Sequence, residues 1–176
     1  DRMLVPISIN VSRLHAYDEK LAETLIRLRE EYDVPPEYVP LELTESAFLE
    51  DEAGMYRRME SLRERGFLVS MDDFGTGYST MNMLKNQTLD EIKIDREFIR
   101  DLEKDKSRII IRNTIVMLQQ LGVHIVIEGV ETEEQKSFLL GCGCTDAQGF
   151  LFHHPMPVEA FDALLLQQEC EYDRTK

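Results

Sequence analysis

Carboxylate side chains placed directly after short apolar runs are the residues of this 176-residue chain best suited to catalysis. Carboxylate and amide oxygens are the ligands that Mg²⁺ and Mn²⁺ prefer in proteins. Two such ions about 3.5–4 Å apart form the usual clamp for hydrolysis of a phosphodiester. Of two adjacent aspartates, one can bridge the ions and the other can serve one ion. The candidate metal ligands are Asn10, Glu42, Asp72, Asp73 and Glu128.

Two further polar residues, Lys93 and Gln148, border apolar runs of the same kind. A lysine in this position can orient a water molecule or neutralise a phosphate oxygen. Structural interpretations stay open for single residues: adjacent aspartates also form turns, Lys93 can be an ordinary strand-end lysine, and Asn10 can be a helix cap. The set as a whole, rather than any one member, indicates a site.

The elements that must position these residues are β-rich runs that alternate with amphipathic helical stretches. Alternation of strands and helices along a whole chain predicts a parallel sheet with crossover helices. The expected strands are residues 5–9, 38–43, 67–71, 91–94, 123–127 and 148–152. Helices are expected after Asp18, from Met55 towards Gly66, over residues 107–121, from a capping box at Thr132, and from Pro157.

The position of the polar residues separates two fold classes. We assign one polar residue, or one pair, to the carboxyl end of each expected strand. In a (β/α)8 barrel the catalytic groups lie at these ends and converge on one face. An open doubly wound sheet instead concentrates its site at one switch point. We therefore predict an α/β fold, a TIM-like barrel that forms a single domain over residues 1–176.

The same polar residues lie in six motifs that resemble those of the EAL domain family, in order and at the family's spacings. The resemblance runs from about residue 7 to residue 157, and the aspartate-pair motif alone is highly specific. The motifs are Asn10-Val11-Ser12, Glu42-Leu43-Thr44-Glu45, Asp72-Asp73-Phe74-Gly75-Thr76-Gly77-Tyr78-Ser79, Lys93-Ile94-Asp95, Glu128-Gly129-Val130-Glu131 and Gln148-Gly149.

The resemblance implies a phosphodiesterase that hydrolyses cyclic di-GMP to linear pGpG with Mg²⁺ or Mn²⁺. It implies metal-ligand roles for the five candidate ligands named above, and Glu128 also matches a glutamate viewed as the base. Lys93 is a further catalytic candidate beside Glu128. Gln148 matches a glutamine near the metal-bound water. Glu45 matches a glutamate that anchors the loop after the third expected strand, about residues 74–84, which couples metal binding to dimer contacts.

The family's first two strands have no counterpart among the six runs. They carry the Glu-x-Leu-x-Arg stretch, and the tripeptides Glu23-Thr24-Leu25 and Glu60-Ser61-Leu62 match it only on expected helices. The chain therefore reads as six of eight strand–helix units: a piece of a longer regulatory protein, a proteolytic fragment or a degenerate domain. We expect weak activity or none from these residues alone. The alternative function is a non-catalytic sensor that binds cyclic di-GMP or a partner protein; an unrelated phosphate–sugar barrel fits the fold but not the motifs.

Composition limits the partners. With 34 acidic and 20 basic residues the net charge is −14, which argues against a nucleic-acid polymer as ligand. No apolar run reaches the roughly 18 residues of a membrane span, and three unpaired cysteines fit a reducing cytoplasm. We expect a cytoplasmic homodimer or swapped oligomer, with GGDEF or sensor domains upstream and membrane attachment of the parent left open. His153 and His154 are set aside as metal ligands because neighbours in a strand face opposite ways.

Overall fold

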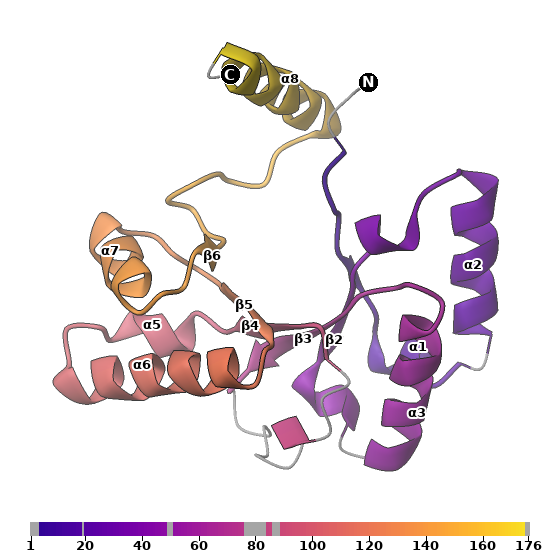
Figure 1. The fold of residues 1–176 in the computed structure, drawn as a ribbon, viewed down its shortest axis with the longest axis horizontal. Helices are drawn as coiled ribbons and strands as arrows, with labels where there is room; N and C mark the ends of the chain where they lie inside the picture. The colour runs from indigo at the N-terminus through magenta and orange to yellow at the C-terminus, as the bar shows by residue number, and fades with distance from the viewer. Residues whose placement is uncertain (1–3, 19, 49–50, 76–83, 86–88, 175–176) are drawn as a thin grey trace.

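The chain forms one parallel sheet of six strands, seen in a computed structural model that describes residues 4–18, 20–48, 51–75, 84–85 and 89–174. The strands lie side by side in chain order, so each connection crosses over to the next position. Figure 1 shows the sheet flanked by helices, with the last helix apart from it beside the N-terminal segment. The strands are β1 Ile9–Asn10, β2 Leu41–Thr44, β3 Val69–Phe74, β4 Glu91–Ile94, β5 His124–Ile127 and β6 Asp146–Ala147.

Local sequence signals mark the ends of several helices, although α3 begins at Glu52 rather than at Met55, and the short helices α1 and α5 were not predicted. Thr132 and Gln135 form a reciprocal capping box, and Gly66 and Gly122 take left-handed backbone conformations just after helices. Within the described residues, no helix is both long and apolar enough to cross a bilayer. The helices are α1 Arg13–Ala16, α2 Leu21–Glu31, α3 Glu52–Arg63, α5 Glu97–Arg100, α6 Asp105–Gln120, α7 Glu133–Gly141 and α8 Val158–Arg174, with 3-10 turns at Pro36–Tyr38 and Glu45–Phe48.

Two of the six strand predictions are misplaced. The first strand is residues 9–10, not 5–9, because only its end pairs with β2. The last is Asp146–Ala147, not residues 148–152. The apolar segment that follows it forms a turn instead: the backbone N–H groups of Phe152 and His153 donate to the carbonyl of Gly149 rather than to a strand. His153 and His154 therefore do not belong to a strand, and strand alternation does not decide which way they face.

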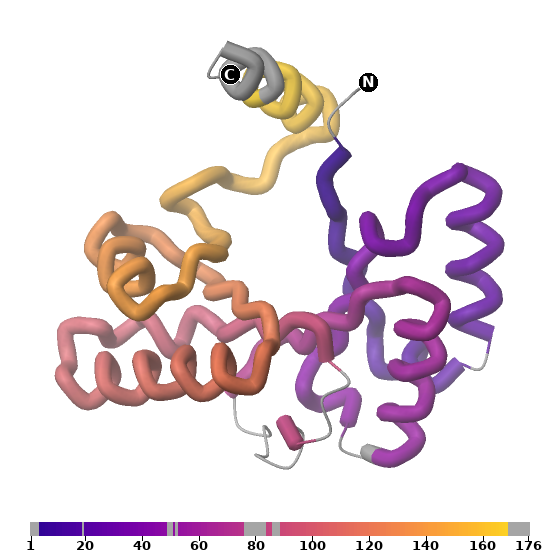
Figure 2. The backbone as a smooth tube through the Cα atoms, viewed as in Figure 1, coloured from indigo at the N-terminus to yellow at the C-terminus, as the bar shows by residue number. Residues whose placement is uncertain are grey.

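Alternation along the strands separates the core from the site. Side chains such as Leu41, Leu43 and Ile92 are fully buried, whereas Glu42 and Lys93 between or beside them reach one another on the other face. The helices add matching apolar stripes, with Ile111, Ile115 and Leu118 of α6 fully buried at helical spacing. The backbone tube in Figure 2 shows the segment after β6 curving away from the sheet to α8, which lies beside the N-terminal segment. The sheet is thus an incomplete (β/α) barrel with a polar interior.

A chain of hydrogen bonds joins four strands at their amino-terminal ends. Glu91 of β4 accepts from the Ser70 hydroxyl at 2.9 Å, and its second oxygen lies 2.9 Å from His124 Nδ1. The other ring nitrogen of His124 lies 3.4 Å from a carboxylate oxygen of Asp146. Partial burial lowers the pKa of His124, but the hydrogen bonds and charges of Glu91 and Asp146 outweigh it, so the pKa is raised.

We expect His124→Gln to destabilise the protein in a pH-dependent way. Because the folded-state pKa of His124 lies above its unfolded value, its contribution is complete below that value and lost as pH rises through the folded one. The side chain is half exposed, so melting by circular dichroism should show a loss of about 1–3 °C near pH 6 and a smaller one near pH 8.5. His15→Gln, on exposed α1, is the control. An equal loss at both pH values would contradict the assignment.

Candidate active site

An irregularity in β3 brings two adjacent carboxylates to the same place. Neighbouring residues of a regular strand face opposite sides of the sheet. Here the register with β4 shifts between Met71 and Phe74, and Asp73 takes a left-handed backbone conformation with φ 58°. The Asp73 N–H donates to a carboxylate oxygen of Asp72 at 3.0 Å, which supports this uncommon conformation. The bulge therefore lets Asp72 and Asp73 both serve the interior of the barrel.

Asp72, Asp73 and Glu128 form a cluster in which one oxygen from each lies within 4.8 Å of the others. Glu128 directly follows β5, and its backbone N–H continues the ladder to β4 by donating to the carbonyl of Ile94 at 3.0 Å. Burial raises the pKa of Asp72 and of Glu128, and the charge of Lys93 only partly opposes this rise. The structure thus brings half-buried carboxylates of like charge together across two strands.

Lys93 of β4 links the two sides of this acidic site. Its Nζ lies 2.8 Å from Glu42 Oε1 and 2.8 Å from Glu128 Oε1, and its side chain is 8% exposed. Burial opposes the charged form of Lys93, but the hydrogen bonds and charges of Glu128 and Glu42 prevail, so its pKa is raised. A buried ammonium between two carboxylates holds three strands at a fixed separation.

Gln148 and Glu45 support the site from outside the cluster. Gln148 follows β6 and donates its amide N–H to Glu128 Oε1 at 2.5 Å. Glu45, 2% exposed, accepts from the backbone N–H of Gly75 at 3.3 Å, where the segment after β3 begins. Its other oxygen is buried and has no hydrogen-bond partner among the described residues. Residues 76–83 of the predicted anchored loop, which include residues 76–79 of the aspartate-pair motif, lie outside the described residues.

The remaining candidate ligands lie further from the cluster. Asn10 is exposed at the end of β1, opposite Glu42 in the strand register. Glu42 is buried and paired with Lys93, and the three-carboxylate group found in the described part of the chain does not include it. The strand ends therefore bring Glu42, Lys93 and the cluster to one face, with Asn10 at its open edge.

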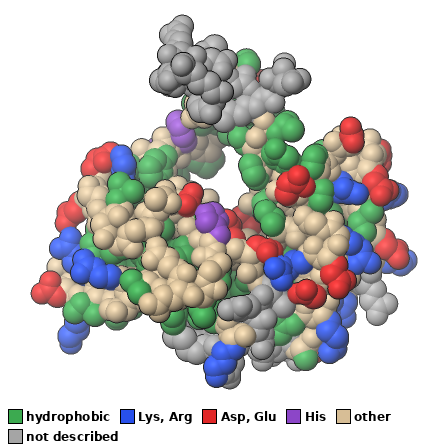
Figure 3. Space-filling view, in the orientation of Figure 1, with side chains coloured by type: hydrophobic (Ala, Val, Ile, Leu, Met, Phe, Trp, Pro, Cys, Tyr) green, Lys and Arg blue, Asp and Glu red, His purple; other side chains and the backbone are tan. Residues whose placement is uncertain are grey.

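A cleft of about 780 Å³ opens beside the cluster. Asp73, Glu128 and Gln148 line one part of it, and α8 contributes Phe161 and Leu164. Figure 3 shows acidic side chains around the hollow between the two halves of the molecule. Residues that sequence reasoning did not select also line this cleft: Arg96, Phe150, His153, His154, Pro155 and Met156.

Local sequence signals for these residues were weak. Arg96 directly follows the Lys93-Ile94-Asp95 motif, so its position just after a strand end could have identified it as a candidate site residue. Phe150 and His154 stack with ring centroids 4.3 Å apart, a contact that depends on the turn after Gly149. Asp95, expected to stabilise a loop, accepts a hydrogen bond from the Glu97 N–H at 2.7 Å and also lines the cleft.

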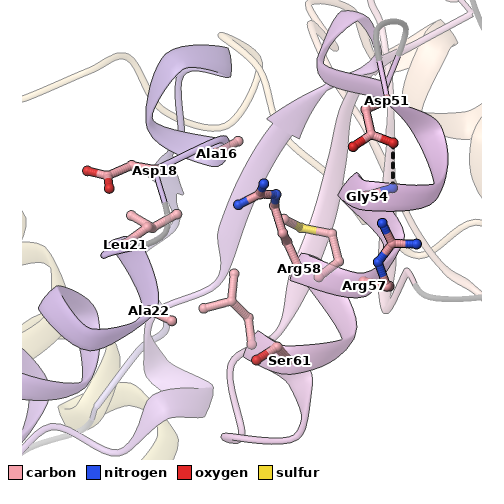
Figure 4. A pocket seen from close by; sticks show the side chains of 11 residues that line it. Ala16, Asp18, Leu21, Ala22, Asp51, Gly54, Arg57, Arg58 and Ser61 are labelled. Atoms are coloured by element: carbon pink, nitrogen blue, oxygen red, sulfur yellow. Dashed lines mark hydrogen bonds between the residues drawn. The ribbon is translucent and has the colours of Figure 1, made fainter.

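A second hollow, of about 250 Å³, lies between α3 and the segment around α1 and α2 (Figure 4). Its polar groups serve local structure. Asp51 accepts from the Gly54 N–H at 2.8 Å and caps α3, and Arg58 donates to the Tyr17 carbonyl at 3.3 Å while lying over the Tyr17 ring. This hollow is lined by helices and their caps, and none of the strand-end candidate residues lines it.

The chain is similar in sequence to one domain family and to proteins named as its members. The EAL domain family model matches residues 2–155. The cyclic di-GMP phosphodiesterase RocR of Pseudomonas aeruginosa is 35% identical over 158 residues, which are 89% of this chain and 40% of RocR. The chain spans between a fifth and two fifths of the length of the first curated relatives it matches.

Solved structures agree in fold. The PaMucR phosphodiesterase in complex with c-di-GMP superposes with a TM-score of 0.83 at 37% identity, over 89% of this chain and 64% of that one. The EAL domain of Mycobacterium smegmatis DcpA superposes with a TM-score of 0.87 at 35% identity, over 92% and 73% of the two chains. With a family match across most of its length, the chain belongs to the EAL domain family.

Proposed function

We propose that this domain hydrolyses cyclic di-GMP to linear pGpG in a metal-dependent reaction. The observation that carries the proposal is the convergence of Asp72, Asp73 and Glu128 from two strands, with Lys93 beside them. Membership of the family supports it, as do a relative named as a cyclic di-GMP phosphodiesterase and a similar structure in complex with c-di-GMP.

The residues present suit a divalent cation of the Mg²⁺ or Mn²⁺ type. The cluster offers only hard oxygen donors, and its three carboxylates outnumber the single ammonium group of Lys93 beside them. Asp72, Asp73 and Glu128 would hold the metal, and we propose Glu42 and Asn10 as further ligands from the neighbouring strand ends. When bound, such ions lower the pKa of a water molecule and offset phosphate charge.

Protein groups around the cluster provide the remaining chemistry. In the reaction a water oxygen attacks phosphorus and the bond to the 3′ oxygen breaks, which leaves a 5′ phosphate and a 3′ hydroxyl. Glu128, whose pKa is raised by burial, is suited to accept the proton of that water. Gln148 orients Glu128 through its amide N–H. Lys93 can donate to a phosphate oxygen, and Glu45 positions the segment after Asp73 through Gly75.

Addition of Mn²⁺ should raise the melting temperature, because an ion that binds only the folded state stabilises it by mass action, by about 2.7 kcal/mol at a hundred times the Kd. Asp72→Asn should remove most of this shift. Without metal it should melt slightly higher than the wild type, since one of several crowded like charges is gone. Differential scanning fluorimetry with and without Mn²⁺ measures both effects.

Glu103→Gln, which removes the same charge from an exposed turn, should keep the Mn²⁺ shift. A folded wild-type sample whose melting temperature does not respond to millimolar Mn²⁺ would count against the metal site.

We also propose that these 176 residues hydrolyse cyclic di-GMP only weakly by themselves. The sheet has six strands, two fewer than a closed (β/α)8 barrel, so the site has an open side at Asn10. A metal ligand or catalytic group that an open barrel leaves misplaced can lower the rate of the reaction about 100-fold. Chromatography of pGpG release, with RocR as the reference, should show turnover lower by at least that factor. Turnover close to that of RocR would contradict the proposal.

The same assay separates the enzyme from the alternative sensor. In a longer form of the protein that closes the barrel, we expect hydrolysis that Asp72→Asn or Glu128→Gln abolishes. Binding of cyclic di-GMP by that form without release of pGpG would instead support a non-catalytic sensor.

We propose further that the chain associates with itself. Among the described residues, β1 and β6 each pair on one side only, and exposed apolar side chains occur at Ile7, Ile9 and Phe150. Ile109 and Ile110 add an exposed apolar patch on α6. Light scattering should give a dimer or larger species at tens of micromolar, and Ile110→Glu should weaken it if α6 takes part. A monomer at that concentration would overturn this expectation.

A further inference from the structure

Arg96 is the one lysine or arginine among the described residues that line the large cleft. Four carboxylates line the same cleft, at Asp73, Asp95, Glu128 and Glu131. Within the described part of the chain, the Arg96 side chain makes no hydrogen bond and no ion pair, although the chain carries 34 acidic residues. An arginine left without a carboxylate partner in such surroundings is available to a ligand.

The backbone around Arg96 is held in place from two sides. Asp95 caps the following turn through the Glu97 N–H, and Arg96 itself precedes α5. Gly129, the residue after Glu128, has a left-handed conformation with φ 67°. A Cβ at Gly129 would lie 2.4 Å from the Cβ of Arg96, so the two segments touch where only glycine fits. The base of the Arg96 side chain is thereby fixed next to the segment that carries Glu128.

The chemistry of the proposed substrate requires a second cationic contact. A cyclic dinucleotide carries two phosphodiesters, each with one negative charge, and only one can be cleaved at the carboxylate cluster. The other must lie in a cleft whose charged side chains are four carboxylates and Arg96, where an uncompensated anion is repelled. A guanidinium matches a phosphate with two parallel hydrogen bonds and stays charged at any working pH.

We propose that Arg96 binds the phosphodiester of cyclic di-GMP that is not cleaved. The assignment rests on the proposed function, since it takes the ligand from there. Arg96 also borders a smaller hollow of about 350 Å³ that Arg100 lines. Arg100 differs in two respects: it pairs with Glu97 at 3.3 Å, and it does not line the large cleft.

The test compares Arg96→Gln with Arg100→Gln, a control that removes the same charge four residues away. Affinity of each folded variant for cyclic di-GMP is measured by calorimetry with Ca²⁺ present, at low and high salt. Loss of a charge-assisted contact should weaken binding by Arg96→Gln about 10- to 100-fold at low salt, and Arg100→Gln should stay within about twofold of the wild type. The deficit should shrink at high salt because screening weakens the lost interaction in the wild type.

Three results would overturn the assignment in different ways. Wild-type affinity in Arg96→Gln would show that Arg96 does not touch the ligand. A deficit of the same size at all salt concentrations would indicate a contact with a neutral group, such as the guanine base, rather than with a phosphate. Failure of the wild type to bind, in the longer form that closes the barrel, would instead refute the proposed function, so the two failures are distinguishable.

Discussion

The buried ion pair of Lys93 with Glu42 and Glu128 is the interaction on which the rest of the site depends. It joins β2, β4 and the end of β5 through two contacts of 2.8 Å. Removing three charges from water is costly, and the arrangement is stable only because each charge has a partner. The same contacts hold a surplus of negative charge at the strand ends, which is what a site for a divalent cation requires.

This charge arrangement needs a break in the strand pattern. Regular alternation places the apolar side chains of β2 to β5 against the helices and the polar ones in the barrel interior. Asp72 and Asp73 are adjacent, so alternation alone would send one of them towards the helices. The bulge and the left-handed backbone of Asp73 resolve the conflict at a local cost of about 1–3 kcal/mol. The strained backbone at this point accompanies the approach of both carboxylates to Glu128, with one oxygen of each residue within 4.8 Å of the others.

The open sheet explains why one molecule combines an ordered site with an exposed edge. Strands β2 to β5 each pair on both sides and carry the buried residues of the core, whereas β1 and β6 pair on one side. The cluster lies on the well-paired strands, but Asn10 and the cleft with Phe150 and α8 lie towards the edges. Packing therefore supports the carboxylate cluster more firmly than it supports the part of the cleft near Phe150 and α8.

The sequence by itself determined the family, the barrel class, the strand–helix order and the identity of the polar residues at the strand ends. Hydrophobic periodicity, helix caps such as Thr132 and short motifs are local signals that survive without a structure. Local propensity failed after Gly149, where an apolar segment that resembles a strand forms a turn, with the N–H groups of Phe152 and His153 donating to the Gly149 carbonyl. Only the tertiary structure decided that Asp72 and Asp73 lie together with Glu128, that Lys93 lies between two carboxylates, and that Arg96 lines the cleft. These facts depend on strand register and on contacts between residues distant in the chain, and a one-residue change of register would alter all of them.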